Sequence, residues 1–129
     1  MVYLKNKYFT RWTHKQGITD HILWEAIQEF KNGLFEANLG NHLFKKRIAL
    51  PGKGKSGGVR TVLFYQKGKK LIFCFGFNKN QQDNLSDGEF KLLNKLSDIY
   101  QNISEEGVIK NLKYKEFFEI SGMEEFDEK

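Results

Sequence analysis

The sequence predicts a small α+β domain in which a helical hairpin is followed by a twisted antiparallel sheet and a C-terminal helix. Three observations lead to this prediction: helical apolar periodicity within residues 8–33, period-two alternation between residues 43 and 77, and a helix-start signature after residue 84. A chain of 129 residues is most simply one domain that can bury a core. Helices and strands in separate parts of a chain are typical of the α+β class.

The first third is predicted to form a short strand and two helices. Residues 2–4 favour a strand, and the apolar spacing from Phe9 onward favours a helix that Gly17 ends. Asp20 is the expected N-cap of the second helix, and Gly33 is its expected C-terminal stop. The apolar face of that helix consists of Ile22, Leu23, Ala26, Ile27 and Phe30.

The middle of the chain is predicted to form the sheet. Strands are expected at 43–50, 59–65 and 71–77. Residues 66–69 are the expected hairpin turn, and residues 34–42 are an expected connection. The segment 51–58 has four glycines among eight residues and is predicted to lack regular structure.

The clearest helix start in the chain is a capping box formed by Ser86 and Glu89. The apolar positions that follow predict a helix as far as residue 103, and Ser104 is an expected cap for one more short helix. Residues 112–120 fit a helix or an edge strand equally well.

The composition indicates a single-domain protein of a reducing compartment. We expect one domain over residues 1–122 and a frayed acidic tail over residues 123–129. The single cysteine, Cys74, lies in an apolar run, which excludes a disulfide framework and fits a reducing cytoplasm. No apolar leader is visible, and no apolar run approaches the roughly 18 residues of a membrane span.

Positive charge is concentrated in the predicted sheet. Residues 41–80 hold ten Lys or Arg and no Asp or Glu, whereas residues 81–129 hold six basic and twelve acidic residues. A basic surface of this kind fits a polyanion, and nucleic acid is the first candidate.

Several short motifs accompany this charge. They are F-x-R-W at 9–12, K-K-R-I-A at 45–49, G-K-S-G-G-x-R-T at 54–61, F-G-F-x-K-N at 75–80 and D-N at 83–84. Together they resemble the RelE/ParE superfamily of toxins from bacterial toxin–antitoxin modules, in its RelE/HigB-like branch. The resemblance covers residues 1–120 and implies the α+β fold predicted above, without a metal or cofactor.

The resemblance implies one of two activities. Most characterised RelE-like members are endonucleases that cut mRNA in the ribosomal A site and block translation, whereas ParE-like members poison DNA gyrase. Residues 78–84 contain neither the Tyr nor the His that the nucleases commonly place there, which favours the gyrase alternative. A non-catalytic module that binds nucleic acid or a partner is the third reading.

For RNA cleavage, a site must deprotonate the 2′-hydroxyl, stabilise the phosphorane and protonate the leaving 5′-oxygen. Arg60 is the first candidate for phosphate stabilisation and Arg47 the second, because a guanidinium fork matches phosphate oxygens. Lys79 is the candidate base or proton donor, and Asp83 the candidate partner of Lys79 or base. The expected RNA-binding lysines are Lys45, Lys46, Lys53 and Lys55.

The expected partners are mRNA and the ribosome, together with a cognate antitoxin, commonly of helix-turn-helix type, that the family resemblance implies. A basic sheet needs an acidic or amphipathic segment to cover it, which gives the antitoxin an electrostatic reason. The histidines and Cys74 do not have the spacing of a zinc site, and no membrane partner is expected.

Overall fold

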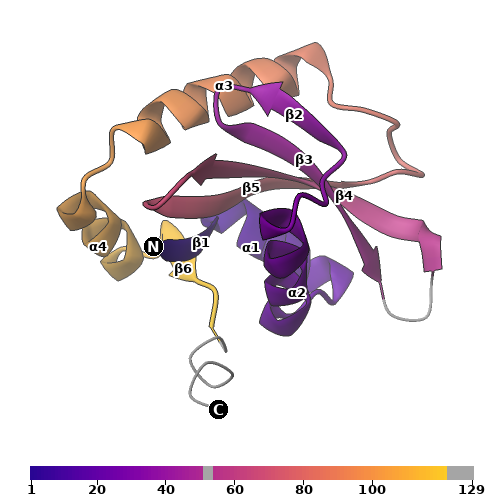
Figure 1. The fold of residues 1–129 in the computed structure, drawn as a ribbon, viewed down its shortest axis with the longest axis horizontal. Coiled ribbons are helices and arrows are strands. Elements are labelled where there is room, and N and C mark those ends of the chain that lie inside the picture. Colours follow the sequence, from indigo (N-terminus) through magenta and orange to yellow (C-terminus); the bar gives the residue numbers. More distant parts are fainter. Residues whose placement is uncertain (51–53, 122–129) are drawn as a thin grey trace.

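The computed structural model describes residues 1–50 and 54–121, and for residues 54–57 it describes the backbone alone. Within this part of the chain, four helices and six strands form an α+β domain, which confirms the predicted class (Figure 1). In order, the elements are β1 (Val2–Asn6), α1 (Lys7–Gln16), α2 (Asp20–Lys31), β2 (Ala37–Gly40), β3 (Leu43–Leu50), β4 (Gly54–Gln66), β5 (Lys70–Asn78), α3 (Asp87–Gln101), α4 (Glu105–Lys113) and β6 (Phe117–Glu119).

The described strands form one sheet in the order β2-β3-β4-β5-β1-β6. The predicted antiparallel part is present, since β3, β4 and β5 pair in that way. The sheet as a whole is mixed, because β1 runs parallel to β5. Only a connection that crosses over the sheet can bring two parallel strands together, and the chain makes this one through α1, α2 and the β2–β4 strands.

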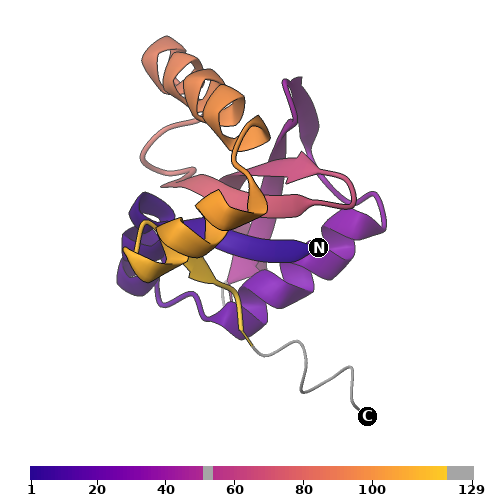
Figure 2. The ribbon, with the colours of Figure 1, turned by 90° about the vertical axis from the view of Figure 1, so that its left-hand side faces the viewer.

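Helices lie on both faces of the sheet (Figures 1 and 2), and an apolar core is buried on each face. Helices α1 and α2 cover one face, where Phe9, Trp24 and Ile27 pack against Leu63 and Phe73. Helices α3 and α4 cover the other face, which Figure 2 shows on the far side of the sheet from α2. In the described chain, no helix is long and apolar enough to span a bilayer.

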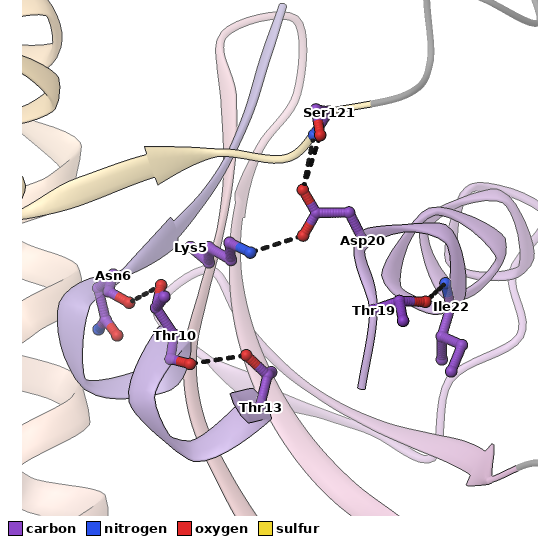
Figure 3. A network of polar contacts seen from close by, with 8 residues as sticks. All are labelled: Lys5, Asn6, Thr10, Thr13, Thr19, Asp20, Ile22 and Ser121. Carbon is purple, nitrogen blue, oxygen red and sulfur yellow. Dashed lines mark hydrogen bonds and ion pairs between the residues drawn. The ribbon is translucent and has the colours of Figure 1, made fainter. Parts of the chain in front are cut away.

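Three expectations from the sequence were wrong. The segment 51–58 was expected to lack regular structure, but β4 begins at Gly54 and pairs with the end of β3. Gly58 is accommodated there because a Cβ would lie 2.6 Å from the carbonyl oxygen of Ile48. The connection 34–42 contains the short strand β2, and the N-cap of α2 is Thr19, whose Oγ1 accepts from the Ile22 N–H (Figure 3). Asp20 is instead the first helical residue.

Other expectations are confirmed. Strand β3 spans the predicted residues 43–50, and Ser86 with Glu89 forms the predicted capping box of α3. Ser104 caps α4. Of the two readings left open for residues 112–120, the edge strand is the one present, as β6 beside β1. The expected acidic tail, residues 123–129, lies outside the described residues.

A glycine sets the position of α1 on the sheet. The Trp12 ring lies on the backbone of Gly76 in β5, where an added Cβ would be 2.4 Å from ring carbons Cε3 and Cζ3. Asn6 caps the same helix by accepting from the Phe9 N–H at 2.8 Å. Helix α1 therefore lies beside the C-terminal half of β5, beyond the point where β1 ends.

Asp20 joins three parts of the chain that are far apart in sequence (Figure 3). Its carboxylate accepts from Lys5 Nζ of β1 at 2.6 Å, and from the N–H and Oγ of Ser121 at 3.0 Å each. Burial would raise the pKa of Asp20, but the hydrogen bonds from Lys5 and Ser121 and the charge of Lys5 hold that pKa below its ordinary value. The ionised carboxylate therefore stabilises the folded state.

Helix α3 is held to the turn between β2 and β3 by polar contacts. Asn41, in the left-handed region at φ 51°, donates to Asn94 and Asp98 and accepts from Gln101 at 2.8 Å. Its carbonyl accepts from the Ser97 hydroxyl. The C-terminal half of α3 is thereby fixed over the sheet.

Candidate nucleic-acid interface

A row of cationic and aromatic side chains crosses three neighbouring strands. Arg47 of β3 lies opposite Arg60 of β4, and Arg60 lies opposite Phe77 of β5. Directly opposed residues share a face of the sheet, and so do residues two apart on one strand, which adds Lys45. We call Lys45, Arg47 and Arg60 the cationic row. It lies on the face that carries α3, because Val62, two residues after Arg60, belongs to the α3 core.

Arg60 is held in place by a carboxylate. Its Nε donates to Glu36 Oε1 at 2.8 Å, and its side chain is 7% exposed, against 36% for Glu36. Glu36 lies just before β2, where its N–H bonds to the carbonyl of Lys45. The bond to Glu36 uses Nε, and a guanidinium carries further N–H donors on its two terminal nitrogens, which is the fork that suits a planar, two-pronged contact.

Lys45 connects the row to the segment between β5 and α3. Its Nζ donates to Asn84 Oδ1 at 2.9 Å and lies 6.0 Å from the centre of the Phe77 ring. These contacts hold Asn84 over the face that carries Arg47 and Arg60. Asp83, the adjacent residue, is exposed.

Lys46 is on the other face of the sheet. Its Nζ is paired with Glu29 of α2 at 2.7 Å, and its side chain is 7% exposed. Neighbouring residues of a strand point to opposite faces, so the pair Lys45-Lys46, which the sequence grouped as RNA contacts, is divided between the two faces. Only Lys45 lies with Arg47 and Arg60.

For the remaining predicted site residues, the structure gives no contact with the cationic row among the described residues. Lys79 directly follows β5, two residues after Phe77, and is exposed. No hydrogen bond or ion pair joins Lys79 to Asp83 within the part of the chain that the structure describes. Lys53 and the side chain of Lys55 lie outside the described residues.

A cleft with a volume of about 850 Å³ lies between α1 and α3. Its lining includes Lys7, Tyr8 and Arg11 of α1, Phe75 of β5 and Leu92 of α3. The rings of Tyr8 and Phe75 are stacked with centres 5.5 Å apart and planes at 9°. The described residues contain no group of three or more His, Cys, Asp or Glu that could hold a metal ion.

The sequence reasoning missed Glu36 and Tyr8. Glu36 is the last acidic residue before the acid-free stretch 41–80, and that position was the signal that could have drawn attention to it. Tyr8 carried no such signal, because an aromatic residue beside Phe9 in a short helix reads as part of the core. The contact between α1 and β5 is what brings Tyr8 to the cleft.

Comparison with protein families identifies a family for this chain. A family model described as the RelE toxin of the RelE / RelB toxin–antitoxin system matches residues 1–120. The matched segment runs from β1 through β6 and includes every member of the cationic row. No curated protein matches the chain.

Proposed function

Because the chain belongs to the RelE family of toxins from toxin–antitoxin systems, we propose that it is an endoribonuclease that cuts mRNA on the ribosome and so inhibits translation. The observation that carries the proposal is the cationic row, in which Arg60 is fixed through Nε to Glu36 beside Arg47. Two guanidinium groups on one face suit the phosphate of a single nucleotide link.

The proposed reaction is an internal transesterification. The 2′-oxygen attacks the adjacent phosphorus, the bond from phosphorus to the 5′-oxygen breaks, and the products carry a 2′,3′-cyclic phosphate and a 5′-hydroxyl. Arg60 and Arg47 stabilise the negative charge that builds up on the phosphorane oxygens. Glu36 is a positioning residue, because it orients Arg60 before the substrate arrives.

Two protons must move in this reaction, one from the 2′-hydroxyl and one to the 5′-oxygen. Lys79 is our candidate proton donor to the 5′-oxygen, and Asp83 is our candidate acceptor of the 2′-hydroxyl proton. Both are exposed residues of the segment that Lys45 holds through Asn84. Lys45 supplies affinity for the phosphate backbone.

The family pairs each toxin with an antitoxin. We infer that a cognate antitoxin, of the helix-turn-helix type, covers the cationic row with an acidic or amphipathic segment. Because translation takes place in the cytoplasm, we propose that the toxin acts there.

The test is inducible expression with transcript-end mapping. We expect the wild type to arrest growth and to create new 5′ ends inside coding sequences. We expect Arg60→Lys, which keeps the charge but removes the fork, to lower the cleavage rate about 10²–10³-fold, the typical cost of one stabilising donor. Lys67→Ala is the matched control, because Lys67 is an exposed cation outside the cationic row, in the hairpin turn that follows β4.

Three results would count against the proposal. Intact transcripts in arrested cells would refute it. DNA-damage signalling with normal translation would identify the gyrase-directed alternative instead. Harmless expression without any antitoxin would identify a non-catalytic binding module.

A further inference from the structure

A line of aromatic rings leads from α1 to the cationic row. Tyr8 stacks on Phe75 with ring centres 5.5 Å apart, and Phe75 lies 6.1 Å from Phe77. Lys45 Nζ lies 6.0 Å from the Phe77 ring centre. The rings and Lys45 therefore form one continuous series of contacts from α1 across β5 to β3.

Tyr8 is unusual among these rings because it is 55% exposed although it is stacked. Phe77, by contrast, is buried. A stacked ring uses one face for its neighbour, so an exposed tyrosine in this arrangement offers its second face to a ligand. A flat aromatic face of this kind is what unpaired nucleobases stack on.

The surroundings of Tyr8 complete the features of a nucleotide site. Lys7 and Arg11, on the same helix, line the same cleft and are exposed cations. On α3, Leu92 is 56% exposed and also lines the cleft, so it offers an apolar surface to the opposite side of a base. Single-strand binding sites combine stacking surfaces with cations that follow the phosphates.

The cations of this surface suit RNA as the occupant, because they can contact the phosphates of a strand. Lys7, Arg11 and Lys45 give the α1 and β3 sides of the surface three positive charges. Two acidic residues, Glu116 and Glu89, also line the cleft, and the Glu89 carboxylate accepts from the Ser86 N–H and from Gln82 Nε2 at 2.9 Å each. Its hydrogen bonds are therefore directed at the start of α3.

We propose that Tyr8 is a base-stacking residue that binds one nucleotide of the RNA strand adjoining the nucleotide link held at Arg60. The inference rests on the proposed function, because it takes the cationic row as the place where the strand is cut. Arg11 and Lys7 contact the phosphates that flank the stacked base.

The test measures binding of a fluorescent 2′-O-methyl oligoribonucleotide of about ten nucleotides, a length within the range of single-strand sites. The 2′-O-methyl group prevents transesterification, so binding is measured without cleavage. Tyr8→Phe keeps the ring and is expected to bind like the wild type. Tyr8→Leu keeps apolar bulk on Phe75 but removes the flat ring, and is expected to bind about 5- to 150-fold more weakly, from the free energy of one stacked base.

Tyr114→Leu is the matched control, because Tyr114 is an exposed tyrosine next to a lysine, Lys113, at the end of α4. We expect no change in binding for it. A second measurement on the wild type avoids any question of variant folding. A 4-thiouridine probe is cross-linked to the protein, and an adduct within residues 7–11 supports the inference.

Equal binding by Tyr8→Leu and Tyr8→Phe, adducts only outside residues 7–11, or no binding by the wild type would overturn the inference. These results are distinct from failure of the proposed function. A wild type that cleaves RNA while binding does not depend on Tyr8 refutes only the stacking site. A wild type that binds through Tyr8 but leaves transcripts intact refutes only the nuclease.

Discussion

Replacing Asp20 by Asn should destabilise the fold in a way that depends on pH. The substitution keeps the size of the side chain, so Ser121 can still donate to an amide oxygen. It removes the charge that faces Lys5 Nζ at 2.6 Å. It also leaves the Lys5 ammonium, on a side chain that is 11% exposed, without its carboxylate.

The magnitude follows from the charged hydrogen bond between Lys5 and Asp20 that the substitution removes. A hydrogen bond to a charged group contributes about 1.5–3 kcal/mol. The Asp20 side chain is partly exposed, so solvent screening reduces the expected destabilisation to about 1–2 kcal/mol. For 129 residues, the entropy of unfolding is about 0.27 kcal/mol/K, so this destabilisation lowers Tm by about 4–7 °C near neutral pH.

The sign of the pH dependence follows from the lowered pKa of Asp20. A carboxyl whose pKa is lower in the folded state stabilises that state fully above its unfolded-state pKa, which is about 4. That stabilisation is lost as the pH falls through the lower, folded-state pKa. The Tm difference between wild type and Asp20→Asn should therefore be constant from about pH 7 to 5 and should shrink below about pH 4.

The assay is thermal unfolding followed by circular dichroism at about pH 7, 5 and 3. Asp83→Asn is the control, since it removes one negative charge from an exposed residue that lacks an ion pair among the described residues. We expect the Tm of this control to stay within about 2 °C of the wild type. A Tm difference for Asp20→Asn that is absent at pH 7, or that grows as the pH falls, would refute the reasoning.

Three further predictions concern the site and its supports. Glu36→Ala should lower the single-turnover cleavage rate about tenfold with little change in RNA binding, and Glu36→Gln should recover part of the rate because its amide oxygen still accepts from Arg60; faster cleavage by Glu36→Ala would mean that Glu36 masks Arg60. Gly76→Ala should cost about 1–3 kcal/mol in urea unfolding, because the new Cβ meets the Trp12 ring at 2.4 Å; a cost that persists unchanged in a Trp12→Ala background would contradict that cause. Asn41→Ala should lower Tm by about 4–7 °C and speed hydrogen exchange in α3, whereas a similar drop without faster exchange in α3 would assign the effect to the turn alone.

Local features of the fold could be predicted because they depend on residues close in sequence. The capping box needs only Ser86 and Glu89, and the limits of β3 follow from alternation between residues 43 and 50. The predicted N-cap of α2 was wrong by one residue, because Thr and Asp are both good N-caps and they are adjacent here. The Asp20 carboxylate instead accepts from Lys5 and Ser121, which are distant in sequence.

Contacts between segments that are distant in sequence could not be predicted in this way. The parallel pairing of β1 with β5 joins residues about 68 apart, and no short pattern encodes it. Strand β2 has four residues and no marked alternation, so the sequence gives no signal for it. It forms by pairing with the edge of β3. The glycines of 54–58 suggested a loop, whereas Gly58 approaches the Ile48 carbonyl of β3 closely and Gly54 already pairs with Leu50.

The candidate site was predictable in composition but not in arrangement. The acid-free stretch drew attention to Arg47 and Arg60, and the register places these two residues opposite each other. The ion pair of Arg60 with Glu36, and the burial of Lys46 against α2, depend on side-chain packing across elements. Proximity of Lys79 to Asp83 in sequence did not produce an ion pair between them within the described residues.

The place of β1 in the sheet has a consequence for how the chain folds during its own synthesis. β1 is made first, yet its two neighbours are β5, at residues 70–78, and β6, at residues 117–119. It leaves the ribosome with both edges unpaired, and such non-local pairing slows folding. The sheet is therefore complete only after β6 has been made, and a chain that stops before β6 would keep one edge of β1 open.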